Sequence, residues 1–167
     1  NPMQAQITDI SDKTALLAIQ GPAATGIVRR LMHGALPGIA YYHAVEPSPD
    51  DFLGLEGVIL SHTGYTGEPG LEIYCRTEDA VTIWRALLKE GAADGIKPAG
   101  LGARDTLRLE SGYCLYGNDI DATTTTLEAG LGWITKLDKP DFIGAEGSPV
   151  KRDGKVAKLR IEIKDVP

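Results

Sequence analysis

The sequence has no apolar run that approaches the ~20 residues a membrane-spanning helix needs. Its 17 Lys and Arg residues are scattered and the net charge is −6, so the electrostatic footprint of a nucleic-acid-binding protein is missing. The first residues carry neither a basic segment nor an apolar core, and so they lack the pattern of a signal peptide. These absences predict a soluble, cytoplasmic protein with no membrane or nucleic-acid partner.

Cysteine is also scarce. The two cysteines, Cys75 and Cys114, are too few for a disulfide framework, and we expect two reduced, buried thiols. His33, His43 and His62 lack the spacing of metal ligands and have no cysteine cluster near them. The sequence therefore predicts no metal site.

Two further kinds of chemistry lack their motifs. The segment 118–121 (Asn-Asp-Ile-Asp) resembles part of a calcium loop, but the Gly and the distal Glu of that motif are missing. No Gly-x-Ser-x-Gly motif and no Cys/His pairing supports a hydrolase. No catalytic residue is predicted on these grounds.

What is present is the composition of a globular protein, with 43% hydrophobic and 24% charged residues. A length of 167 residues suits one domain, or one domain with pieces of others. Apolar spacing predicts a strand at 15–20, a helix between Pro22 and Gly34, strands at 39–45, 57–62 and 71–76, and a helix that Thr77 caps and that ends near Gly91. The order β-α-β-β-β-α is close to a ferredoxin-like α+β sandwich.

The rest of the chain is less regular. A helix is expected at 101–110, with Leu101, Leu107 and Ala103 facing inward. A long polar loop at 116–126, a strand at 133–137, a linker at 144–154 and a strand at 155–164 follow. The last strand is expected to begin another domain. Because the chain starts at Asn1 rather than Met and stops within a strand pattern, we expect a fragment of a longer protein.

The most distinctive segment joins the strands at 57–62 and 71–76. Gly64, Gly67 and Gly70 recur at a spacing of three, which permits positive φ angles and a close approach of a flat ligand. From the glycines alone, an ordinary β-turn is the favoured explanation. A phosphate loop is excluded because no Gly-Lys-Ser/Thr follows and a strand, not a helix, comes next.

Charged residues in and near this segment are candidates for ligand contacts or for ordinary surface positions. Glu72 alternates with apolar neighbours, so it either lies on a solvated strand face or is directed at a partner, whereas Glu68 is expected at an exposed loop tip. Arg104 either joins a surface ion pair or reaches a ligand or a buried acid. Asp105 and Arg108 are three apart and are expected to pair on the helix surface.

Several long motifs together resemble a known family. They are Leu-Ala-Ile-Gln-Gly-Pro at 17–22, Gly-Tyr-Thr-Gly-Glu-Pro-Gly-Leu-Glu-Ile at 64–73, Ala-Gly-Leu-Gly-Ala-Arg-Asp-Thr-Leu-Arg-Leu-Glu at 99–110, Gly-Tyr-Cys-Leu-Tyr-Gly-Asn-Asp-Ile-Asp at 112–121, and Phe-Ile-Gly at 142–144. The stretch 125–133 resembles the family's Thr-Pro-x-Glu-Ala-Gly-Leu-x-Trp, with Thr126 in place of the proline. In this order and spacing the chain resembles the central part of the T-protein of the glycine cleavage system, an aminomethyltransferase.

The resemblance implies transfer of one carbon. The lipoylated H-protein presents an aminomethyl group, tetrahydrofolate accepts the methylene as a substrate, and ammonia leaves. The family's folate-binding Tyr, Glu and Arg fall on Tyr65, Glu72 and Arg104. The resemblance also implies that residues 1–145 form the folate-binding region, with a ferredoxin-like domain and part of an adjoining α/β region. Residues 146–167 would be the linker and the first strand of a C-terminal β-barrel.

Other parts of the family's site fall outside the chain. The catalytic Asp and a folate-contacting Asn are expected before Asn1, and a further Arg contact is expected after Pro167. Asp119 and Asp121 belong to a different block and are not substitutes for the catalytic Asp. The chain alone is therefore expected to be inactive.

Relatives of the family leave alternatives open. Folate-dependent demethylases and the folate domains of dimethylglycine and sarcosine dehydrogenases share the glycine-rich turn and the Arg helix. A flavin-binding Gly-x-Gly-x-x-Gly domain upstream would indicate a dehydrogenase. A non-catalytic folate-binding relative, the iron–sulfur maintenance factor, is disfavoured because its Lys-Gly-Cys-Tyr-x-Gly-Gln-Glu motif is absent.

Overall fold

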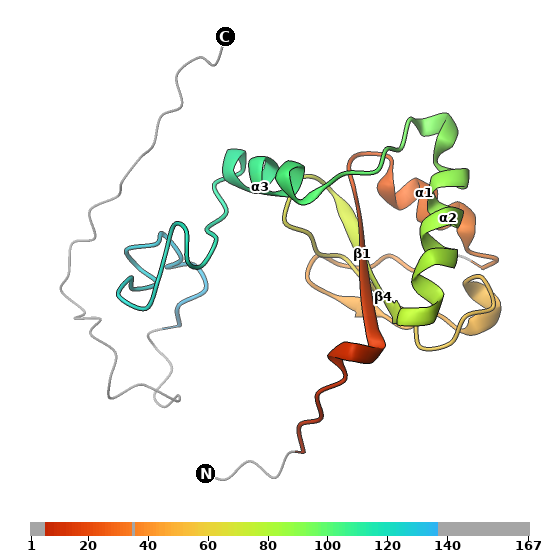
Figure 1. Cartoon of the computed structure of the whole chain (residues 1–167), viewed down its shortest axis with the longest axis horizontal. Coiled ribbons are helices and arrows are strands. Elements are labelled where there is room, and N and C mark those ends of the chain that lie inside the picture. Colours follow the sequence, from red (N-terminus) through yellow and green to blue (C-terminus); the bar gives the residue numbers. More distant parts are fainter. Residues whose placement is uncertain (1–5, 35, 137–167) are drawn as a thin grey trace. The chain divides into compact units, whose positions relative to one another are not determined.

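The computed structural model describes residues 6–34 and 36–136. The chain divides into two compact units, Asn1–Gly112 and Tyr113–Pro167, and the first holds the sheet and the helices labelled in Figure 1. In the described part of the second unit the backbone forms turns and one parallel bridge between Tyr116 and Ile120. The predicted linker and barrel strand at 146–167 lie outside the described residues.

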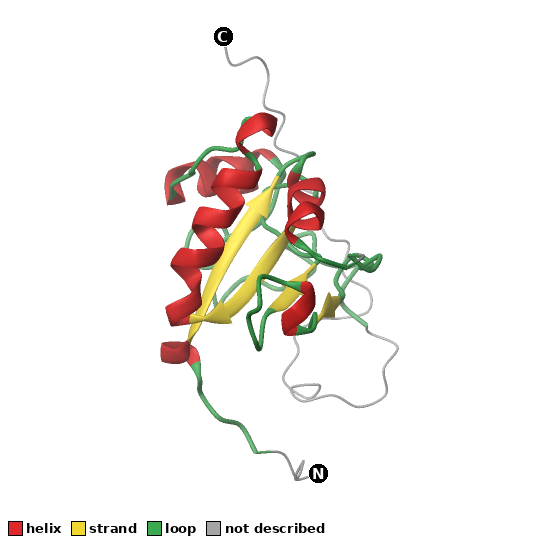
Figure 2. Ribbon diagram, turned by 90° about the vertical axis from the view of Figure 1, so that its right-hand side faces the viewer, coloured by secondary structure: helices red, strands yellow, loops and turns green. Residues whose placement is uncertain are grey.

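The first unit is built on a four-stranded antiparallel sheet with the order β1-β4-β3-β2. The elements are β1 (Thr14–Gln20), α1 (Ala24–Leu31), β2 (Ala44–Val45), β3 (Ile59–Ser61), β4 (Gly70–Arg76), α2 (Ala80–Glu90) and α3 (Leu101–Glu110), with 3-10 turns η1 (Ser11–Lys13), η2 (Pro49–Asp51), η3 (Thr77–Asp79) and η4 (Ala92–Asp94). Figure 2 shows the strands as one twisted layer with helices beside it. The α+β class and the element order are confirmed, while the ferredoxin-like detail stays a prediction.

Strand β4 decides what each face of the sheet presents. Its side chains alternate, so that Leu71, Ile73 and Cys75 are buried while Glu72 and Tyr74 are only half-buried. The buried set joins a single core with apolar residues of α1 and α2, which are Ala24, Ile27, Val28, Ile83 and Leu87. Each buried Val, Leu or Ile side chain of this set contributes about 1.5–3 kcal/mol. Helices α1 and α2 thus cover one face, and Glu72 lies on the other.

The second strand is shorter than the 39–45 predicted from its apolar residues. A turn intervenes, in which His43 donates its backbone N–H to the Ala40 carbonyl at 2.9 Å. Tyr42 takes a φ of 63°, which no strand residue adopts. Pairing with β3 therefore starts only after this turn.

Three other local predictions were wrong. Thr77 does not cap α2, because it begins the 3-10 turn η3, which precedes that helix. The Thr77 hydroxyl instead donates to the Asp12 carbonyl at 3.2 Å. In α3 the expected inward residues are exposed, with Leu101 at 81%, and Arg108 is buried instead. Residues 132–134 form a turn where a strand at 133–137 was predicted. Only for Thr77 does a contact distant in the sequence replace the predicted local one.

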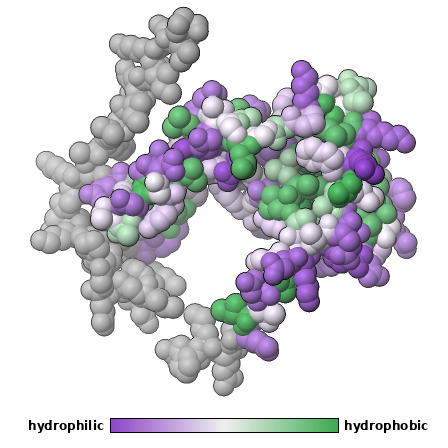
Figure 3. Space-filling model, viewed as in Figure 1, coloured by the Kyte–Doolittle hydropathy of each residue, from purple (hydrophilic) through white to green (hydrophobic). Residues whose placement is uncertain are grey.

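The surface of the first unit mixes polar and apolar areas, and Figure 3 shows green, apolar patches among purple, hydrophilic ones. Its exposed apolar side chains include Leu16, Ile59 and Trp84. Of the two cysteines, Cys75 is buried as expected and Cys114 is only partly buried. Within the described ranges no helix is long and apolar enough to cross a membrane.

Candidate functional site

The site predicted from the sequence is centred on the glycine-rich loop, defined here as residues 62–69 between β3 and β4. Only Gly67 among its glycines has a positive φ, at 76°, which is the turn conformation that favours glycine. Gly64 and Gly70, the first residue of β4, are absent from the set of positive-φ glycines. The expectation of positive φ thus holds at one of the three positions.

Gly64 and Gly70 instead leave room for the side chain of Gln20 at the end of β1. A Cβ built at either glycine would come within 2.7 Å of Gln20 Cδ. Gln20 Nε2 donates to the carbonyl oxygens of Thr63 and Leu71, each at 3.3 Å. The space left by these glycines is occupied by the protein itself, and sequence reasoning missed this role of Gln20.

Tyr65 and Arg104 meet at the loop. The Arg104 guanidinium carbon lies 4.5 Å from the centroid of the Tyr65 ring, which is a cation–π distance. Tyr65 is half-buried and Arg104 is exposed. The Ser111 hydroxyl, just after α3, lies 2.8 Å from the Leu107 carbonyl oxygen of its own helix and 3.2 Å from the Thr66 carbonyl oxygen of the loop. The structure therefore brings together two of the three predicted folate-binding residues.

Glu72 lies on β4 beside the loop, paired in register with Ala18 of β1 and Ser61 of β3. The Thr63 hydroxyl donates to Glu72 Oε2 and also lies 3.0 Å from Ser61 Oγ. Among the ion pairs of the described residues, none joins Glu72 to Arg104. Glu72 is therefore neither fully solvated nor held by an arginine.

The charge of Glu72 affects its neighbour on the same strand face. The pKa of the Tyr74 hydroxyl is raised, first by partial burial and second by the nearby Glu72 carboxylate. Glu68, by contrast, lies exposed in the loop as expected. Of the two acids of this hairpin, Glu72 is the one in a partly dehydrated, hydrogen-bonded position.

The predicted pair on α3 forms, but only its acid is exposed to solvent. Arg108 Nη2 lies 2.8 Å from Asp105 Oδ1, and Arg108 is only 3% exposed. The Asp105 side chain remains 54% exposed. The sequence could not distinguish this arrangement from an exposed pair, because the spacing of three is the same in both.

The acids of the second unit are used within their own loops. Asp119 Oδ2 accepts the Leu115 N–H at 2.8 Å, and Asp121 Oδ1 accepts the Thr123 N–H at 2.8 Å. The hydrogen bond from the Thr123 hydroxyl is the main cause of the lowered pKa of Asp121. No group of three or more His, Cys, Asp or Glu that could hold a metal was found in the part of the chain that the structure describes.

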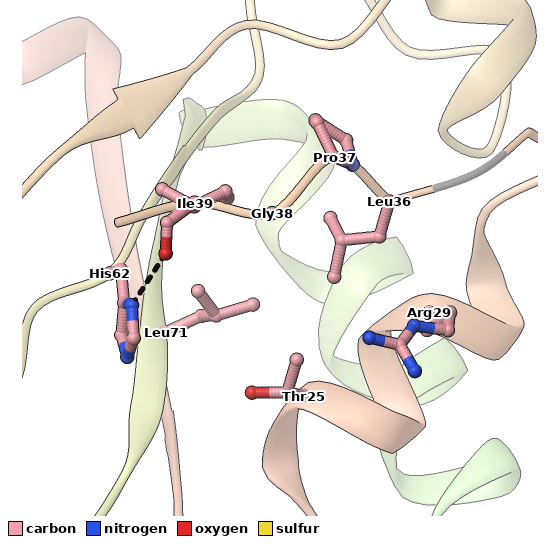
Figure 4. Close-up of a pocket in the computed structure, with 8 residues that line it drawn as sticks. All are labelled: Thr25, Arg29, Leu36, Pro37, Gly38, Ile39, His62 and Leu71. Atoms are coloured by element: carbon pink, nitrogen blue, oxygen red, sulfur yellow. Dashed lines mark hydrogen bonds between the residues drawn. The ribbon is translucent and has the colours of Figure 1, made fainter. Parts of the chain in front are cut away.

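A separate hollow of about 150 Å³ lies on the helix-covered side of the sheet (Figure 4). It is lined by Thr25, Arg29, Leu36, Pro37, Gly38, Ile39, His62 and Leu71. His62 Nδ1 lies 2.7 Å from the Ile39 carbonyl oxygen at its edge. Because Leu71 and Glu72 point to opposite faces of β4, this hollow is not part of the predicted folate site.

A comparison with protein families decides the assignment. The profile described as "GCVT N-terminal domain" matches residues 1–139. The chain belongs to this family. The loop, β4 and α3 all lie within the matched part, and so do Tyr65, Glu72 and Arg104.

Individual GCVT relatives agree with this assignment. The chain is 48% identical over 159 residues to an aminomethyltransferase of Flavobacterium psychrophilum, covering 95% of this chain and 43% of the relative. It is 54% identical over 144 residues to an aminomethyltransferase of Porphyromonas gingivalis, covering 85% of this chain and 39% of the relative. The chain thus spans about two fifths of the length of these relatives.

A solved GCVT structure supports the fold. The crystal structure of glycine cleavage system aminomethyltransferase T from Bartonella henselae matches with a TM-score of 0.66 and 34% identity. The match covers 80% of this chain and 35% of that one. The resemblance to the T-protein family is therefore confirmed by sequence and by structure.

Proposed function

We propose that this chain forms the folate-binding part of a tetrahydrofolate-dependent aminomethyltransferase of glycine degradation. Its substrates are the aminomethyl-lipoyl group of the H-protein and tetrahydrofolate. The bonds from the aminomethyl carbon to sulfur and to nitrogen break, bonds to two folate nitrogens form, and ammonia and the reduced lipoyl thiol leave. Membership of the GCVT family and the names of the relatives support this proposal.

Glu72 is the proposed acceptor for the pterin ring. A reduced pterin presents two N–H donors on one edge, and a carboxylate can accept both through charge-assisted hydrogen bonds. The Thr63 hydroxyl occupies Oε2, but an ionised carboxylate has about four acceptor sites, so capacity remains. The position of Glu72 on the sheet face opposite α1 and α2 supports its access to a ligand.

Tyr65 and Arg104 are the proposed second and third contacts. The Tyr65 ring offers a flat apolar surface with a hydroxyl, and Arg104 can hold an anionic or carbonyl group of folate. Their 4.5 Å stacking supports a shared role, since each limits the motion of the other. Three groups suited to folate border one loop in a member of the GCVT family, and that arrangement carries the proposal.

The finer architecture belongs to the proposal as well. By resemblance, residues 1–145 form the folate-binding region with a ferredoxin-like domain, and 146–167 lead into a C-terminal β-barrel. We use "full-length enzyme" for a polypeptide that contains this chain and is as long as its relatives. In that enzyme the catalytic Asp is proposed to precede Asn1. The cytoplasm is the proposed location.

The function is tested by assaying ammonia release from aminomethylated H-protein by the full-length enzyme. Release is expected to depend on tetrahydrofolate and to be matched by formation of methylene-tetrahydrofolate. H-protein with an unmodified lipoyl arm serves as the control and should yield no ammonia. Failure of tetrahydrofolate to accelerate ammonia release would contradict the proposed function.

A further inference from the structure

Gln20 connects the glycine-rich loop to the end of β1. Its amide donates to the Thr63 carbonyl before the loop's first glycine and to the Leu71 carbonyl in β4, each at 3.3 Å. Its Oε1 accepts the Thr66 hydroxyl at 3.1 Å. Both N–H donors and the carbonyl of this one side chain therefore hold the start and the middle of the loop and the strand that follows it.

The residues that Gln20 holds are the direct neighbours of the proposed folate contacts. Thr63 and Thr66 bracket Tyr65, and Leu71 precedes Glu72. The Thr63 hydroxyl also donates to the Glu72 carboxylate. A shift of the loop away from Gln20 would therefore move Tyr65 and Glu72 together.

The glycine-rich loop is shaped around this amide. A Cβ at Gly64 would meet the end of the Gln20 side chain, and a Cβ at Gly70 would meet both Gln20 and the Ile19 backbone carbonyl. The Gly21 N–H adds a further link from the end of β1, donating to the Pro69 carbonyl at 2.8 Å. These contacts restrain the loop without any ligand, and such preorganisation strengthens binding.

We propose that Gln20 is a positioning residue for the reduced pterin, which it does not touch. This inference rests on the proposed function. Gln20 fixes the separation of Tyr65 and Glu72 before folate arrives, and Gly64 is required because any larger residue would displace the Gln20 amide.

A double-mutant cycle on the full-length enzyme tests this role by titration with tetrahydrofolate well below the melting temperature. Gln20→Ala removes three hydrogen bonds and is expected to raise the Kd about tenfold. Gly64→Ala should raise it similarly, because the new Cβ expels the flexible Gln20 amide. The double variant should have a Kd no higher than that of either single variant, since both substitutions remove the same contacts.

Two further variants separate hydrogen bonding from packing. Gln20→Glu keeps the shape but loses both N–H donors, so it should weaken binding as Gln20→Ala does. Gln6→Ala makes the matched change at an exposed position and should leave the Kd unchanged. Amide hydrogen exchange in residues 63–71 should accelerate in the Gln20 variants.

The outcomes distinguish the inference from the function beneath it. If the parent enzyme does not bind tetrahydrofolate, the proposed function itself fails. If the parent binds but Gln20→Ala or Gln20→Glu binds equally well, the positioning role is overturned and the function stands. A lowered melting temperature with an unchanged Kd, or additive losses in the cycle, would equally overturn it.

Discussion

Replacement of Glu72 by Gln is expected to raise the Kd of the full-length enzyme for tetrahydrofolate by about 10- to 100-fold. The substitution keeps the shape of the side chain but exchanges one acceptor oxygen for an NH₂ group. That group would face the N–H donors of the pterin edge, so one charge-assisted hydrogen bond is lost and two donors oppose each other. Isothermal titration measures the change.

The fold should survive this substitution. The remaining carbonyl oxygen of a glutamine can still accept the Thr63 hydroxyl, and the buried side chains of β4 are untouched. Glu68→Gln makes the same chemical change at an exposed position in the same hairpin and should alter the Kd less than about twofold. Equal affinity of Glu72→Gln and the parent would remove Glu72 from the site.

The 167-residue chain by itself is expected to show no measurable aminomethyl transfer to tetrahydrofolate. A positioned acid–base group typically contributes about 10²–10⁴-fold in rate, and we have proposed that this group, an Asp, precedes Asn1. The acids available in the second unit, Asp119 and Asp121, already accept hydrogen bonds from their own loop. They are therefore poor replacements for it.

The comparison pairs the chain with the full-length enzyme at equal concentration, using ammonia release as the readout. Circular dichroism of the chain should show its helices, so that inactivity does not reflect unfolding. Turnover by the purified chain that depends on tetrahydrofolate would mean that a catalytic group lies within these residues. It would also refute the proposal, taken from the family, that the catalytic Asp precedes Asn1.

The strands and helices of the core were predictable because local spacing and burial agree. The alternation around Glu72 places Leu71 and Ile73 in the core, and Ile27 and Val28 lie on the inner face of α1 as their helical spacing predicted. In these segments the apolar residues share one face, and that face is the one buried in the core. Local spacing and tertiary packing therefore favour the same helix or strand.

The contacts that organise the site were not predictable in this way. Gln20 reaches residues more than forty positions away, and no local pattern marks a glutamine that fills the space above two glycines. Arg108 is buried although a charged residue is expected at the surface. The family motif indicated which residues to consider here, but only the fold shows that the Gln20 amide fills the space beside Gly64.

Hydrogen exchange of the full-length enzyme with and without saturating tetrahydrofolate tests most directly whether this loop holds folate. Folate is expected to slow exchange in peptides covering residues 63–72 and 101–110, because Tyr65, Glu72 and Arg104 would be immobilised together. Unchanged exchange in both segments, with protection confined to other parts of the enzyme, would contradict the assignment of the folate site to this chain.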